Sequence, residues 1–112
     1  MPPSPNALPL TEPTLLILLS ISPGPKHGYA IMKEVETLSE GRVRLSTGTL
    51  YGALKRLLDE GWIVRVEAPE PNVTDRERKA YMLTDRGRNM LRAEIDRLRQ
   101  LVAVASVRVV EA

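Results

Sequence analysis

The sequence predicts a mainly α-helical fold that carries one small β-hairpin. Apolar residues before position 61 and after position 84 form dense runs or recur at three- and four-residue spacing, which is typical of helices. Between these positions, apolar and polar residues alternate in two short stretches, which is typical of paired strands. A chain of 112 residues has room for one domain built from these elements.

We expect the chain to have three parts. Residues 1–10 contain four of the nine prolines, which favours a flexible, proline-rich arm. Residues 11–84 hold the first three helices and the hairpin. Residues 85–112 form a long C-terminal helix.

The first two helices are marked by a cap and by their apolar residues. Thr11 can cap the first helix, and the dense apolar run Leu15–Leu19 predicts a central position for it. The segment 22–25 contains two prolines and a glycine and should break the chain. The second helix is expected from about Gly28 to Leu38, because its apolar residues recur on one face.

The third helix and the hairpin follow. The helix should begin at Ser46 or Thr47, which are both good N-caps, and Gly61 should end it in a left-handed conformation. A first strand is expected over residues 62–67 and a second over about residues 78–83. The polar, proline-bearing segment between them cannot continue a strand.

The last helix should be capped by Thr84 and run from Asp85 to about Val109. Its apolar residues alternate between four- and three-residue spacing, the pattern of a coiled-coil seam. A helix of this length extends past so small a core, so a second copy is expected to cover the seam in a homodimer. In the monomeric alternative, the seam folds back on the first helix. The expected dimerisation residues are Leu91, Ile95, Leu98, Val102, Ala105 and Val109.

This order of elements is typical of a winged helix-turn-helix domain with a C-terminal dimerisation helix. The second and third helices would form the helix-turn-helix pair, with the third helix in the major groove of double-stranded DNA. Its outward face should then carry small, hydrogen-bonding or cationic side chains. The expected DNA contacts on this helix are Thr47, Thr49, Tyr51, Gly52, Lys55 and Arg56.

Each of these residues also has a structural explanation. Thr47 could only cap the helix, and Tyr51 could be a half-buried core residue with a hydrated hydroxyl. Lys55 and Arg56 could belong to a solvated face, although a docked helix would bring them to phosphates.

The hairpin would form a wing whose tip carries cations beside the minor groove of DNA. Acidic residues are interspersed with these cations, so a loop that neutralises itself is an equal alternative. The expected wing contacts are Arg76, Arg78 and Lys79.

Composition excludes several classes of protein. The chain has no Cys and one His, His27, so it predicts no metal site, no cofactor and no enzymatic activity. His27 is expected to hydrogen-bond local backbone at a helix start. The longest apolar run is too short to span a membrane, and no signal-peptide pattern opens the chain, which favours a cytoplasmic location. The net charge of +2 says little about partners.

Three separated blocks of the sequence resemble the PadR family of transcriptional regulators. They are His27-Gly28-Tyr29, Ser46 to Tyr51, and Arg78 to Thr84, in that order, within about residues 11–92. The resemblance implies a winged-helix fold, a homodimer and control of transcription, as in short family members with a single C-terminal helix. It also favours a phosphate contact for Tyr51.

Two residues depart from the family pattern. Gly52 stands where the family commonly has proline, which leaves the third helix less rigid, and Trp62 replaces a smaller aliphatic residue. Trp62 is expected to pack in the hairpin, although it could also stack on a planar small-molecule effector.

The expected function is a repressor that binds a palindromic operator as a homodimer. The alternative is a winged-helix protein–protein adaptor without DNA binding. An adaptor would be expected to carry acidic or apolar residues on the outward face of the third helix, where this chain has Thr, Gly, Lys and Arg.

Overall fold

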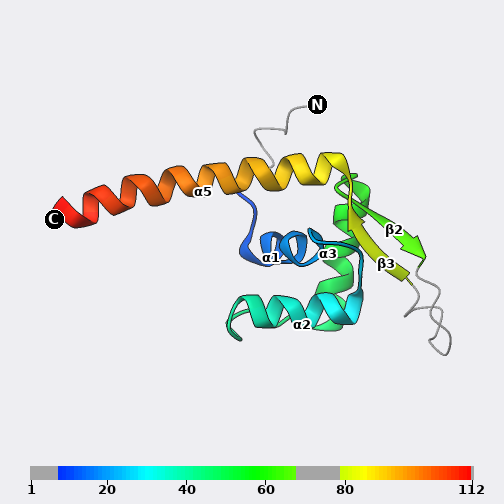
Figure 1. The fold of residues 1–112 in the computed structure, drawn as a ribbon. Coiled ribbons are helices and arrows are strands. Elements are labelled where there is room, and N and C mark those ends of the chain that lie inside the picture. The colour runs from blue at the N-terminus through cyan, green and yellow to red at the C-terminus, as the bar shows by residue number, and fades with distance from the viewer. Residues whose placement is uncertain (1–7, 68–78, 112) are drawn as a thin grey trace.

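The computed structural model describes residues 8–67 and 79–111 of the chain. Within these residues the helices and strands confirm the predicted, mainly helical fold class (Figure 1). In chain order they are α1 (Glu12–Ile21), β1 (Lys26–His27), α2 (Gly28–Leu38), α3 (Thr47–Asp59), β2 (Ile63–Glu67), β3 (Lys79–Leu83) and α5 (Asp85–Glu111).

The sheet has one more strand than the sequence predicts. β2 and β3 pair antiparallel, and β1 adds to the other side of β3, giving the order β1-β3-β2. The Nδ1 atom of His27 lies 3.3 Å from the backbone oxygen of Lys79. His27 therefore contacts backbone as expected, but the backbone belongs to β3 and is not local.

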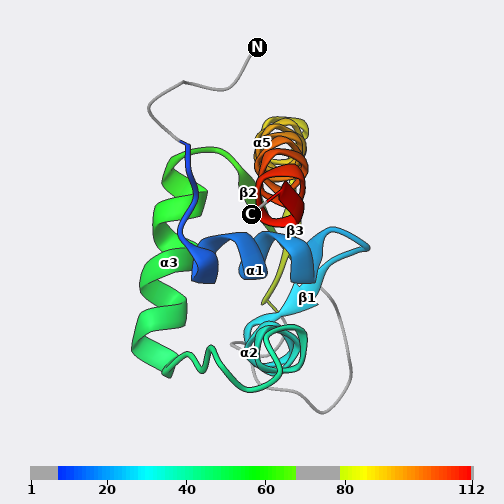
Figure 2. The same cartoon turned by 90° about the vertical axis from the view of Figure 1, so that its left-hand side faces the viewer.

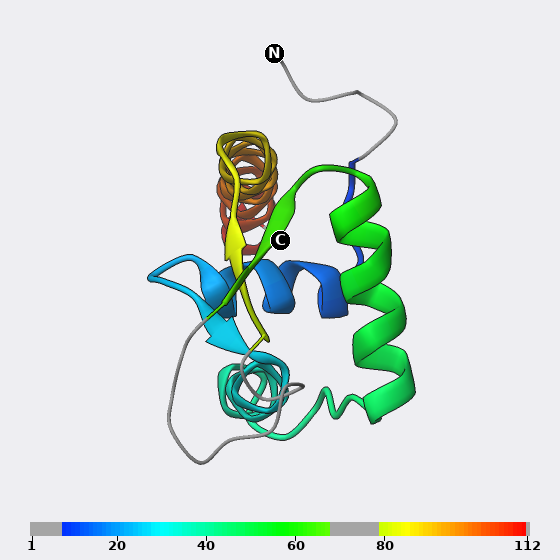
Figure 3. The same cartoon turned by 90° about the vertical axis from the view of Figure 1, so that its right-hand side faces the viewer.

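Helix α1 occupies the centre of the domain. Figures 2 and 3, which look along α5 from its two ends, show α1 between α5 and α2, with α3 beside it. Leu16, Ile17, Leu18 and Ile21 of this helix are buried. The central position predicted from the apolar run is therefore confirmed.

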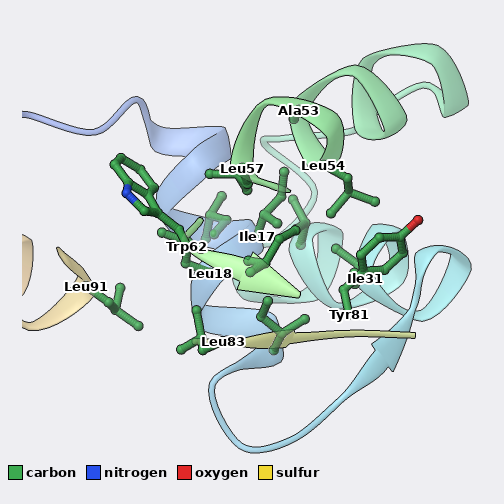
Figure 4. Close-up of a cluster of buried hydrophobic side chains, with 14 of the residues drawn as sticks. Ile17, Leu18, Ile31, Ala53, Leu54, Leu57, Trp62, Tyr81, Leu83 and Leu91 are labelled. Atoms are coloured by element: carbon green, nitrogen blue, oxygen red, sulfur yellow. The ribbon is translucent and has the colours of Figure 1, made fainter. Parts of the chain in front are cut away.

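The core collects apolar side chains from all four helices and from the sheet (Figure 4). Trp62 is only 7% exposed and belongs to this core, so its indole ring is packed and offers no open face for a planar effector. Leu91 of α5 is also buried here and joins the long helix to the domain.

Three of the helices begin at a hydroxyl cap, as predicted. The Thr11 hydroxyl accepts from the amide of Thr14 at 3.3 Å at the start of α1. Ser46, and not Thr47, caps α3 by accepting from the amide of Thr49 at 3.1 Å. At the start of α5, the Thr84 hydroxyl accepts from the amide of Gly87 at 3.0 Å.

A tight junction joins the end of α3 to the start of α5. Gly61 ends α3 with a φ of 76°, which confirms its predicted left-handed conformation. The Thr84 hydroxyl donates to the Gly61 oxygen at 2.6 Å, and the Thr84 amide donates to the Trp62 oxygen at 3.1 Å. Gly87 packs directly on this backbone, since a Cβ on Gly87 would lie 1.9 Å from the Trp62 oxygen.

A buried carboxylate ties the segment before α1 to α5. Glu94 is 1% exposed, and its Oε2 accepts from the amide of Leu10 at 2.6 Å, while Oε1 accepts from Arg97. Leu8 and Leu10 are partly buried against the core. The end of the expected arm 1–10 thus lies against the domain, and residues 1–7 fall outside the described part.

The pKa of Glu94 lies below its ordinary value. The hydrogen bond from Arg97 lowers this pKa most, burial of the carboxyl opposes the effect, and the Leu10 amide adds to the lowering. Ionised Glu94 therefore stabilises the fold wherever the unfolded carboxyl would also be ionised.

Replacing Gly87 with Ala should destabilise the protein by about 3 kcal/mol, because the new methyl group collides with backbone that cannot rotate away. Gly52→Ala is the matched control, since a Cβ at this helical glycine meets nothing within 4 Å. It should stabilise the protein by about 0.5–1 kcal/mol, because Ala is the better helix former. Urea unfolding of the two variants measures both effects. Similar unfolding midpoints for the two variants would contradict the described packing of Gly87.

Glu94→Gln should reduce the acid sensitivity of the fold. The ordinary pKa of the carboxyl is 4.5 and the folded pKa is lower, so the stabilisation is present above pH 4.5 and lost as pH falls through the folded value. Thermal unfolding midpoints between neutral and acid pH should fall less steeply for Glu94→Gln than for the wild type. Asp96→Asn, an exposed neighbour, should follow the wild-type slope. Equal slopes for Glu94→Gln and wild type would count against this role.

Candidate nucleic-acid interface

Helix α3 turns one face into the core and the opposite face outward. Leu50, Ala53, Leu54 and Leu57 are buried. Of the residues expected to contact DNA, Tyr51 is half-buried and the others are exposed. Those exposed residues are Thr47, Thr49, Gly52, Lys55 and Arg56.

Tyr51 packs against the start of α2. A Cβ on Gly28 would lie 2.5 Å from the Tyr51 hydroxyl oxygen, so the ring occupies the space that the glycine leaves free. This contact gives a physical reason for glycine in the His27-Gly28-Tyr29 block. It holds Tyr51, which is half-buried, at the edge of the outward face of α3 and against the start of α2.

Thr49 presents a positioned hydroxyl at the start of α3. The Ser46 hydroxyl donates to the Thr49 hydroxyl at 2.8 Å. Accepting this bond leaves the single proton of the Thr49 hydroxyl available to an outside acceptor. Such a group suits a base edge or a phosphate.

Two open grooves run along the sides of α3. The groove toward α1 has a volume of about 630 Å³, and Gly48, Thr49, Gly52 and Arg56 form its α3 side. The groove toward the hairpin has a volume of about 650 Å³, and Tyr51 and Lys55 of α3 face β2 and β3 across it. The outward face of α3 therefore forms a ridge between two channels.

The β2–β3 hairpin, which we call the wing, is described only at its base. Lys79 is exposed at the start of β3, and its register partner on β2 is Glu67. Arg76 and Arg78 lie outside the described residues. In β2, Ile63 is buried whereas Val64 is 42% exposed. At the start of the strand, the face that carries Ile63 is therefore the one turned toward the core.

The cations differ in whether a carboxylate neutralises them. Arg42, Arg44, Arg97 and Arg99 each form an ion pair with a nearby acidic residue. Among the described residues, by contrast, no ion pair engages Lys55, Arg56 or Arg65. These three cations are therefore available to an external anion. Arg65 was not among the contacts expected from the sequence, which predicted only the strand that carries it.

The expected dimerisation residues separate into two groups along α5. Leu91 is 5% exposed in the core, and Ile95 and Leu98 are half-buried where the helix lies on the domain. Val102, Ala105 and Val109 are exposed on the part of α5 that projects beyond the domain (Figure 1). Leu91 therefore has a partner within its own chain. Further exposed apolar residues on the projecting part are Leu101, Val104, Val107 and Val110.

The part of the chain that the structure describes shows no cluster of three or more His, Asp or Glu side chains able to hold a metal ion. None of its helices combines the length and the apolar character that crossing a membrane requires.

The helix-turn-helix pair, the wing and the projecting α5 together define a winged-helix protein. Residues 17–93 match the model of the transcriptional regulator PadR-like family. The chain belongs to this family of transcriptional regulators.

Solved structures share the fold. A PadR family transcription regulator from hypervirulent Clostridium difficile R20291 has a TM-score of 0.71 at 24% identity, covering 88% of this chain and 99% of that chain. Bacillus subtilis PadR, solved in complex with operator DNA, has a TM-score of 0.65 at 26% identity, covering 78% of this chain and 48% of that chain.

A curated relative is much longer. This chain is 36% identical over 87 residues to a 37.1 kDa protein in transposon Tn4556 of Streptomyces fradiae. The match covers 78% of this chain and 23% of that protein, so the chain spans about a quarter of its relative's length.

Proposed function

We propose that the protein is a transcriptional repressor that binds a palindromic operator as a homodimer, with α3 in the major groove. The observation that carries the proposal is the outward face of α3, which combines an available hydroxyl at Thr49 with unpaired cations at Lys55 and Arg56. Hydroxyl groups contact base edges and phosphates in protein–DNA complexes, and cations contact phosphates. Bacillus subtilis PadR, a structure of the same fold, was solved in complex with operator DNA, which supports DNA as the ligand.

The adaptor alternative fits this face less well. A protein-binding helix would bury apolar side chains against its partner. Among the outward residues of α3 the only acidic one is Asp59, at the end of the helix, and the large apolar side chains of α3 face the core. A ligand that accepts hydrogen bonds and carries negative charge matches this face better. We therefore propose operator DNA as this ligand and the cytoplasm as the location of the protein.

The projecting part of α5 supports the homodimer. Val102 and Val109 are exposed to solvent in a single chain, Val109 to 73%, and so are their apolar neighbours. Soluble monomers rarely leave so continuous an apolar surface in water. Pairing with α5 of a second copy would cover it, and a two-fold dimer would place two α3 helices on the halves of a palindrome. Leu91 is left out of this proposed interface, because the core already covers it.

Lys55→Ala should weaken binding to all duplex sequences alike and reduce the slope of log affinity against log salt by about 1, as expected for the loss of one phosphate contact. Thr49→Ala should instead change the preferred sequence with little effect on the salt slope. Selection of bound duplexes from a random pool identifies the operator, and titrations across a salt series then test both variants. If both leave affinity, slope and preference unchanged, α3 is not the DNA-reading helix.

Val102→Glu should convert the dimer into a folded monomer, because it places a carboxylate in the proposed seam while leaving the domain core intact. Gln100→Glu is the matched control: it adds the same charge two residues away, on the opposite side of α5. Sedimentation should give half the wild-type mass for Val102→Glu and the wild-type mass for Gln100→Glu. A wild-type protein that sediments as a monomer at micromolar concentration would exclude the homodimer.

A further inference from the structure

The groove between α3 and β2 contains a cation that the preceding assignment leaves unused. Arg65 lies in the middle of β2, and its side chain is exposed. Its register partner on β3 is Tyr81. Because cross-strand partners point to the same face of a sheet, Arg65 and Tyr81 share the face turned toward α3. Both residues line the groove, with Lys55 on its opposite wall.

We propose that this groove binds one sugar–phosphate strand of duplex DNA, held between Lys55 on α3 and Arg65 on β2. The proposal rests on the proposed function, since it assumes that α3 enters the major groove. It adds a binding site on the sheet that does not involve the tip of the wing.

The charges in the groove favour a phosphate ligand. Neither Lys55 nor Arg65 forms an ion pair with another described residue, so an incoming phosphate would not have to displace a carboxylate from them. From opposite walls, the Arg65 guanidinium could donate two parallel hydrogen bonds to a phosphate, and the Lys55 ammonium would add a second positive charge. The lining also includes Leu54, Leu58 and Val64, which suit the apolar faces of deoxyribose.

The dimensions of the two partners bring a strand to this place. A helix with its side chains is about 10–12 Å across, and the major groove of B-DNA is about 12 Å wide. A helix seated in that groove therefore has a phosphate strand along each side. On the wing side of α3, the groove that Lys55 and Arg65 line is the place where that strand would lie.

Asp59 allows a second test, in which a substitution should strengthen DNA binding instead of weakening it. This carboxylate lines the same groove at the end of α3 and would repel a bound phosphate strand. If the strand lies in the groove, Asp59→Asn must tighten DNA binding, whereas loss of Arg65 must weaken it. A change in folding would not produce this pair of opposite effects.

The experiment measures the affinity of the full chain for a random-sequence duplex of about two helical turns across a salt series. Arg65→Ala should weaken binding and reduce the salt slope by about 0.9, the value for one phosphate, and Arg65→Lys should keep the wild-type slope. Arg65→Gln, which keeps most of the side-chain length, should behave as Arg65→Ala if the alanine variant folds poorly. Arg88→Ala, which removes an exposed arginine from α5, is the matched control and should leave the slope unchanged.

The outcomes separate the two levels of the argument. A wild-type protein that binds no duplex overturns the proposed function and this inference together. If the wild type binds and Lys55→Ala reduces the slope while Arg65→Ala and Arg65→Gln match Arg88→Ala, the groove proposal alone is wrong. Unchanged affinity in Asp59→Asn would likewise place the strand outside the groove.

Discussion

The whole structure depends on one junction, where the backbone of Gly61 and Trp62 meets Thr84 and Gly87. The Thr84 hydroxyl donates to Gly61 and accepts from Gly87, and the Thr84 amide donates to Trp62. Helix α3 ends, β2 begins, β3 ends and α5 begins at this junction. The junction therefore sets the directions of α3, the hairpin and α5 relative to one another. The missing side chain of Gly87 lets the two backbones approach this closely.

The junction also connects the two proposed activities. The groove between α3 and β2 opens away from it, so the spacing of Lys55 and Arg65 follows from its geometry. Helix α5 leaves the junction in the other direction, and Glu94 holds its base against the segment before α1. A dimer that reads two half-sites must keep its recognition helices about 34 Å apart. Because the base of α5 is held firmly on the domain, a dimer contact between the projecting ends of α5 would also fix the distance between the two α3 helices.

The sequence predicts those features whose signals lie within a few residues. The caps formed by Thr11 and Thr84 are such features, and the structure confirms both. No local signal predicts β1, because two residues show no alternation and its partners lie on β3, far along the chain. Leu91 fits the seven-residue pattern as well as Val102 does, and only the packing of α5 on the core distinguishes them. For Arg65, alternation identifies its face of the strand, but tertiary packing decides that this face turns toward α3.

The glycines of the structure fall into two groups: those that packing within the chain requires and those that it does not require. Gly87 and Gly28 are needed inside the chain, because a Cβ on either would collide with Trp62 or Tyr51. Gly48 and Gly52 lie in α3, where a Cβ would meet nothing within 4 Å, and Gly52, in the helix interior, costs about 1 kcal/mol relative to alanine. No close packing within the described chain requires glycine at either position. Both glycines are exposed and border the groove on the α1 side of α3, the helix that would enter the major groove in the proposed complex. Close approach of backbone to a ligand is a condition that glycine meets, so the proposed DNA binding would account for glycine at two positions where packing within the chain does not require it.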